Sequence, residues 1–151
     1  MFRGANKVTL DAKGRVAVPA RYRERIAATC EGHLVVTVDR DRCLLVYPQT
    51  DWDEIERRLM AAANLSPEVR RLQRLLVGHA TEVDLDSHGR ILISQALREF
   101  ASLDGTAMFV GQGRKFELWD EGRWNERRDA WLMAEGEGAP DLPAELENLS
   151  L

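Results

Sequence analysis

One stretch of the sequence occurs twice, and this repeat limits the possible folds more than any other feature. Residues 10–24 read LDAKGRVAVPARYRE and residues 85–99 read LDSHGRILISQALRE. Residues 38–52 and 110–124 also resemble each other, in the same order. Two matched blocks in one order indicate a unit of about 70 residues that is present twice. The 151 residues therefore suit two small units or one ordinary domain.

Each copy predicts a hairpin as its first element. In the first copy, residues 7–10 and 16–18 are short strands on either side of a four-residue turn. An aspartate that opens such a turn can accept backbone N–H bonds, and a glycine that closes it can adopt the left-handed conformation. The residues expected to shape the two turns are Asp11, Gly14, Asp86 and Gly89.

Helices and a second hairpin complete each copy. Pro19 fits the first turn of a helix that runs to about Ala28, and Ser94 can cap the equivalent helix. Ser66 before Pro67 opens a further helix, whose apolar stripe is expected in the core or in a subunit interface. The other expected elements are strands at 34–38, 43–47, 107–110 and 116–119, and helices at 52–63 and 121–134.

These elements predict two interleaved repeats around one core. A unit of two hairpins and a short helix would leave strand edges unpaired and would be marginally stable alone. Interleaving the copies would pair those edges. The expected organisation is a first repeat over 1–53, a helical connector over 54–79, a second repeat over 80–125, and a C-terminal helix with an acidic tail over 126–151.

Charge is distributed unevenly along the chain. The formal net charge of −4 would by itself argue against a nucleic-acid partner. Residues 1–30, however, carry seven basic and only two acidic side chains. After Arg128 there are six acidic side chains and no basic one. The basic N-terminal segment, which contains the first turn, is therefore a candidate nucleic-acid surface.

Several other classes of protein are disfavoured. Cys30 and Cys43 are isolated and are expected to be reduced thiols, and the three histidines lack the spacing of zinc ligands. No apolar run approaches the roughly 20 residues that span a bilayer, and the N-terminus lacks the apolar stretch of a secretory signal. We expect a cytoplasmic protein that is not an enzyme, with no metal, no cofactor, no catalytic residues and no small-molecule substrate.

At several segments the chain resembles the MraZ proteins, which belong to the AbrB/MazE-like swapped-hairpin group of DNA-binding domains. The segments are Met1-Phe-Arg-Gly, Asp11-Ala-Lys-Gly-Arg-Val-Ala-Val-Pro-Ala-Arg-Tyr-Arg, Arg70-Arg-Leu-Gln-Arg-Leu-Leu-Val-Gly-His-Ala and Lys115-Phe-Glu-Leu-Trp. The match to the family covers nearly the whole chain. Ser94 is a departure, because the family usually has proline there, as the first copy has at Pro19.

The resemblance implies both a fold and a function. The implied fold is α+β and mainly β, a double-split β-pseudobarrel made of two interlocked swapped-hairpin repeats and capped by short helices. The implied function is that of a bacterial transcriptional repressor of the division and cell-wall gene cluster, associated with the nucleoid. Such proteins form ring-like homo-oligomers and bind closely spaced short repeats in the double-stranded promoter DNA of their own operon.

The residues of the hairpin tips fit this function. A two-stranded ribbon fits the major groove, where the planar guanidinium of Arg15 can bond the edge of a guanine. Gly14 would let the turn approach DNA closely, and nearby basic side chains suit phosphates. Glu82, Asp84 and Asp86 would weaken the attraction of the second tip for phosphate. The candidate DNA-binding residues are Arg3, Lys7, Lys13, Gly14, Arg15, His88 and Arg90.

Three other functions stay open at this point. An antitoxin would share the fold, but antitoxins usually carry one such domain and a long toxin-binding arm. A ring-forming structural protein would need the turns but not Arg15. A hydrolase that used Asp86 and His88 would lack a nucleophile motif, metal-ligand spacing and a phosphate-binding glycine loop.

Overall fold

The computed structural model describes residues 1–136 and 142–150, so residues 137–141 and 151 of the expected acidic tail lie outside the described part. The chain forms two compact units, Met1–Glu121 and Gly122–Leu151. No helix among the described residues is both long and apolar enough to cross a membrane. The first repeat contains β1 (Phe2–Thr9), β2 (Arg15–Ala17), α1 (Ala20–Cys30), β3 (His33–Val38) and β4 (Leu44–Pro48).

A helical connector separates this repeat from the second one. The elements there are α2 (Gln49–Ala61), which begins in the expected first repeat and runs into the expected connector over 54–79, then α3 (Pro67–Leu72) and a π-helix, η1 (Gln73–Val77). The second repeat contains β5 (Thr81–Asp84), β6 (Arg90–Leu92), α4 (Gln95–Phe100), β7 (Thr106–Gly113) and β8 (Lys115–Asp120). The C-terminal elements are α5 (Glu121–Gly136) and a short 3-10 helix, η2 (Ala144–Leu146).

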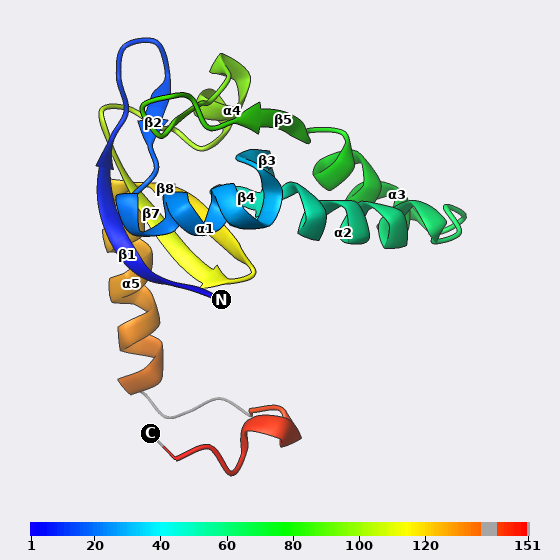
Figure 1. The fold of residues 1–151 in the computed structure, drawn as a ribbon. Helices are drawn as coiled ribbons and strands as arrows, with labels where there is room; N and C mark the ends of the chain where they lie inside the picture. The colour runs from blue at the N-terminus through cyan, green and yellow to red at the C-terminus, as the bar shows by residue number, and fades with distance from the viewer. Residues whose placement is uncertain (137–141, 151) are drawn as a thin grey trace. The chain divides into compact units, whose positions relative to one another are not determined.

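The predicted interlock of the repeats is confirmed by the sheet topology. The main antiparallel sheet has the strand order β1-β7-β8-β4-β3-β5, so strands of the two repeats lie next to each other (Figure 1). Exchanging every strand for its counterpart in the other repeat gives the same order in reverse, which is the pattern of a pseudo-twofold axis. The α+β class is likewise confirmed. Because β1 and β5 are the outer strands, the described main sheet is open rather than a closed barrel.

Strand β1 is longer than the sequence pattern predicted. The alternation of apolar residues indicated a strand at 7–10, whereas β1 begins at Phe2. Its whole length pairs with β7, from Phe2 opposite Gly113 to Thr9 opposite Thr106. The partner strand lies about 100 residues away in the sequence. Local periodicity therefore could not show this pairing.

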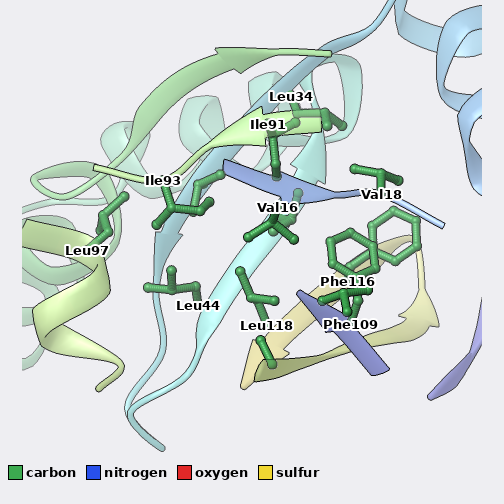
Figure 2. Packing of buried hydrophobic residues seen from close by; sticks show 14 of the residues in the cluster. Val16, Val18, Leu34, Leu44, Ile91, Ile93, Leu97, Phe109, Phe116 and Leu118 are labelled. Atoms are coloured by element: carbon green, nitrogen blue, oxygen red, sulfur yellow. The ribbon is translucent and has the colours of Figure 1, made fainter. Parts of the chain in front are cut away.

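Both repeats contribute to one core. Figure 2 shows Val16 and Val18 of the first repeat packed among Phe109, Phe116 and Leu118 of the second. The same cluster contains the inward-facing side chains of β2, β6, α1 and α4. Buried residues alternate with more accessible ones along β2 and β6, whereas β3 and β4 are buried over most of their length. The core therefore holds the ends of both turns in place.

The helical connector differs from its prediction. Ser66 caps α3 as expected, since its Oγ accepts the backbone N–H of Val69 at 3.2 Å. After Leu72, however, the chain continues as a π-helix, and a change in helical period rotates the apolar stripe. Leu72 and Leu75 are 36% and 37% exposed and line an open cavity of about 650 Å³. Of the two expected locations, the core of the chain is therefore excluded for Leu72 and Leu75, and a subunit interface stays a prediction.

Candidate nucleic-acid interface

The two shortest strands, β2 and β6, form an antiparallel ribbon that joins the repeats. Arg15 lies opposite Leu92, Val16 opposite Ile91, and Ala17 opposite Arg90. Val16 and Ile91 are buried, and successive side chains of a strand point to opposite faces. The other face of the ribbon therefore points toward solvent. It carries Arg15, Ala17, Arg90 and Leu92, and we call it the ribbon face.

This pairing brings Arg15 and Arg90 onto one surface. They are diagonal neighbours across the antiparallel pair, which places their Cα atoms about 7–8 Å apart. Their side chains are similarly accessible, at 32% and 30% exposed. The sequence placed the two arginines at the tips of separate hairpins, each formed by the strands on either side of one turn. For the first turn that pairing is wrong beyond the Leu10–Val16 bridge, because β1 pairs with β7 and β2 pairs with β6. In the structure, one short ribbon presents both.

The turn before β2 holds Arg15 through Asp11. Oδ1 of Asp11 accepts the backbone N–H groups of Lys13 (3.0 Å) and Arg15 (2.8 Å), while Oδ2 accepts Nε–H of Arg15 at 2.7 Å. The backbone N–H of Arg15, together with its guanidinium, lowers the pKa of the Asp11 carboxyl below its ordinary value. A guanidinium has five N–H donors, and among the described residues only the one on Nε is bonded here. Both terminal nitrogens of Arg15 are left for a ligand.

The turn before β6 repeats this arrangement. Oδ1 of Asp86 accepts the backbone N–H groups of His88 (2.8 Å) and Arg90 (2.9 Å), and Oδ2 accepts Nε–H of Arg90 at 2.9 Å. The pKa of Asp86 is lowered for the same reason, first by the backbone N–H of Arg90. Two turns that are distant in the sequence therefore orient their arginines through the same set of local hydrogen bonds.

Each turn glycine packs against the other repeat. Gly14 and Gly89 are buried, with φ of 88° and 73°. A Cβ on Gly14 would lie 2.7 Å from the carbonyl oxygen of Ile93, and one on Gly89 would lie 2.3 Å from Nε of Arg23. The carbonyl of Gly14 accepts the N–H of Ile93 at 2.9 Å, and that of Gly89 accepts the N–H of Val18 at 2.9 Å. These contacts give both glycines a role in the interlock.

The remaining predicted residues lie at different distances from the ribbon face. Lys13 and His88 are exposed in the turns that adjoin it. Lys7 lies on β1, and its Nζ is 3.1 Å from Oε2 of Glu121. Arg3 lies near the start of β1, and the six residues of strand from it to Thr9, at the other end of β1, span about 20 Å. Figure 1 shows β1 running from the N-terminus toward the first turn, so Arg3 is far from the ribbon face.

Sequence reasoning missed two arginines under the turns. The guanidinium carbon of Arg98 lies 2.8 Å from the Cβ position of Gly14, and the Arg23 side chain lies against Gly89 in the same way. Arg23 and Arg98 occupy equivalent positions in the two repeats, 75 residues apart. Each turn is thus accompanied by an arginine from the other repeat. The shared repeat position was the signal that could have identified them.

The acidic residues near the second turn are partly neutralised. Nδ1 of His33 on β3 lies 2.5 Å from Oδ1 of Asp84, and this contact raises the pKa of the His33 imidazole. Asp86 is bound to Arg90 as described. Two of the three carboxylates that the sequence suggested would repel phosphate, Asp84 and Asp86, therefore have bonding partners among the described residues. In the described residues, no three His, Cys, Asp or Glu side chains are grouped in a way that could hold a metal ion.

Comparison with known proteins gives full-length matches. A family model described as "MraZ protein, putative antitoxin-like" matches residues 1–75 and again residues 76–130. A protein of Thioalkalivibrio sulfidiphilus named "Transcriptional regulator MraZ" is 58% identical over 151 residues and all of both chains. Proteins of the same name from Coxiella burnetii and Halorhodospira halophila are 53% and 51% identical, again over all of both chains. The chain therefore belongs to the MraZ family of transcriptional regulators, which is not a family of enzymes.

Proposed function

We propose that the chain regulates transcription by binding promoter DNA through its ribbon face. The observation that carries this proposal is the convergence of Arg15 and Arg90, each held by an aspartate of its own turn, on one exposed two-stranded ribbon. A two-stranded ribbon is narrow enough for the major groove, where an arginine can bond O6 and N7 of guanine. The terminal nitrogens of the two arginines would read bases, and Lys13 and His88 would contact the flanking backbone.

The Asp–Arg pairs favour this role physically. An arginine side chain loses rotamer freedom when it binds, and this loss weakens the complex. Nε of each arginine is already fixed by a carboxylate, so part of the ordering precedes binding. The buried turn glycines would act through the shape of the turns rather than through contact with DNA. Lys7, paired with Glu121, and Arg3, at the far end of β1, would contact phosphates outside the groove that the ribbon enters.

One ribbon can make only a few base contacts, so we further propose that several copies act together. A ring-like homo-oligomer on closely spaced short repeats would make later contacts intramolecular, which raises avidity by about 10²–10⁴. The proposed target is the division and cell-wall gene cluster, with the protein acting as a repressor at its own promoter and associating with the nucleoid. The basis for this target is the family resemblance.

Salt dependence tests whether this binding exists. The purified protein is titrated onto duplex DNA from immediately upstream of its own coding sequence, and onto shuffled DNA of the same length, between 50 and 200 mM salt. Release of counterions from six or more phosphates would lower the affinity about 10³-fold or more over this range. Preference for the upstream duplex together with this fall supports the proposal. A flat response, or equal affinity for the shuffled duplex, would contradict it.

A further inference from the structure

The ribbon face carries a large apolar side chain among its cations. Leu92 is 56% exposed and lies directly opposite Arg15, so the two Cβ atoms are about 4.5–5.5 Å apart. Single exposed leucines are common on protein surfaces and by themselves indicate nothing. Leu92 differs because its neighbour on β6, Ile91, supplies the buried contact of this strand. The exposed leucine therefore is not needed for the core.

The ribbon face is symmetric except at this position. The residue equivalent to Leu92 in the first repeat is Ala17, and the two arginines are equivalent to each other. A pseudo-twofold axis therefore exchanges Arg15 with Arg90 but exchanges a small side chain with a large apolar one. Such a face presents different chemistry at its two ends. It can distinguish the two directions along a DNA site.

The chemistry of Leu92 matches one feature of the major groove. Thymine displays its C5-methyl group there, and apolar side chains contact it. Successive bases on a strand are about 3.4 Å apart along the helix axis, so the roughly 4.5–5.5 Å between the Cβ atoms of Arg15 and Leu92 is more than one base step and less than two. A guanine bonded by Arg15 would therefore place the neighbouring base step beside Leu92.

We propose that Leu92 is a specificity-determining residue that recognises the methyl group of a thymine next to the guanine bound by Arg15. This inference rests on the proposed binding of DNA by the ribbon face. The proposed contact adds an apolar interaction to a surface that otherwise contacts DNA through basic side chains. It also gives each chain a preferred orientation on its DNA site. The group that Leu92 would contact is the C5-methyl group of a thymine in double-stranded DNA.

Base analogues test the contact one atom group at a time. The upstream duplex is first footprinted, and each thymine in the protected repeats is then replaced singly by deoxyuridine, which lacks only the methyl group. In parallel, each guanine is replaced singly by 7-deazaguanine, which lacks the N7 acceptor. Affinities are measured for the wild type, for Leu92→Ala and for Leu65→Ala, a matched change at a residue that is 85% exposed in the α2–α3 connection.

Wild-type protein should lose about fourfold in affinity for each critical deoxyuridine, the equivalent of burying one methyl group. Leu92→Ala should bind the thymine and deoxyuridine duplexes equally, while Leu65→Ala should behave as wild type. The sensitive thymine should lie one step from the guanine whose 7-deaza analogue weakens wild type but not Arg15→Ala.

Several results would overturn the inference. These are indifference of the wild type to every deoxyuridine, a protected repeat without thymine, a sensitive thymine remote from that guanine, or an undiminished deoxyuridine penalty in Leu92→Ala. A change in oligomeric state of Leu92→Ala with that penalty intact would instead make Leu92 a subunit contact. If the wild type did not distinguish the upstream duplex from shuffled DNA, the proposed function would fail as well.

Discussion

Replacement of Arg15 by alanine is expected to abolish specific binding of promoter DNA while leaving the fold intact. A bidentate arginine–guanine contact discriminates by about 1–3 kcal/mol, so binding to a single site should weaken about fivefold to 150-fold. On several repeats bound together the losses compound, and affinity should fall to that for unrelated DNA. Band retardation of the upstream duplex, with shuffled duplex as competitor, measures this loss.

Two companion variants separate base reading from charge. Arg57→Ala removes the same side chain from α2, where Arg57 is 68% exposed and paired with Glu54, and should retain wild-type affinity. Arg15→Lys keeps the charge but not the planar fork, so it should retain nonspecific affinity and lose preference for the repeats. Since the exposed Arg15–Asp11 pair contributes little to stability, Arg15→Ala should unfold near the wild-type temperature. If a folded Arg15→Ala protein retarded the upstream duplex as strongly as the wild type does, Arg15 would not be the residue that reads the bases.

Replacement of Phe116 by alanine should destabilise both repeats at once. Phe116 on β8 is fully buried, and its ring centroid lies 4.2 Å from that of Phe2, 4.9 Å from that of Tyr22 and 4.6 Å from that of Phe109. Phe2 and Tyr22 belong to the first repeat, so the cavity would open in a core that both repeats share. The expected loss in the free energy of unfolding is about 3–5 kcal/mol, a large part of the stability of an ordinary domain.

Chemical denaturation followed by circular dichroism and by tryptophan fluorescence measures this effect. The two signals should move together to lower denaturant, because one cooperative core predicts coincident transitions. Phe100→Ala is the matched control, since Phe100 on α4 is only partly buried and the expected loss is smaller. Two separated transitions in Phe116→Ala, with one repeat still folded, would contradict an interlocked core.

Local chemistry in the sequence predicted much of the site. The Asp-x-x-Gly-Arg segments have few ways to close a hairpin, because the carboxylate needs N–H partners and the glycine needs positive φ. The bonds of Asp11 and the φ of Gly14 follow that expectation. The Ser66 and Ser94 caps, which depend on neighbouring residues only, are also confirmed. The repeat itself predicted that the halves would interlock.

The features of the site that depend on long-range strand pairing could not be predicted from the sequence. Arg15 and Arg90 share a face only because β2 pairs with β6, 75 residues away in the sequence. That register also decides which side chains point outward, so the exposure of Leu92 could not be foreseen. The contact of Arg98 with Gly14 likewise depends on how one repeat crosses the other. Periodicity within a segment carries no information about such partners.

The most direct test of the central claim is DNA cleavage by a reagent tethered to the turn that adjoins the ribbon face. Ala12 is exposed in the first turn, whereas Cys30 and Cys43 are only 7% and 0% exposed, so Ala12→Cys should accept a thiol-reactive iron chelate selectively. Ala63→Cys, in the exposed α2–α3 connection, is the matched control. We predict that the Ala12→Cys conjugate cuts the upstream duplex once per repeat, within a few base pairs of the protected guanines, and that the Ala63→Cys conjugate does not. Cleavage from Ala63→Cys, with none from Ala12→Cys on bound DNA, would contradict the assignment of the ribbon face as the DNA-binding surface.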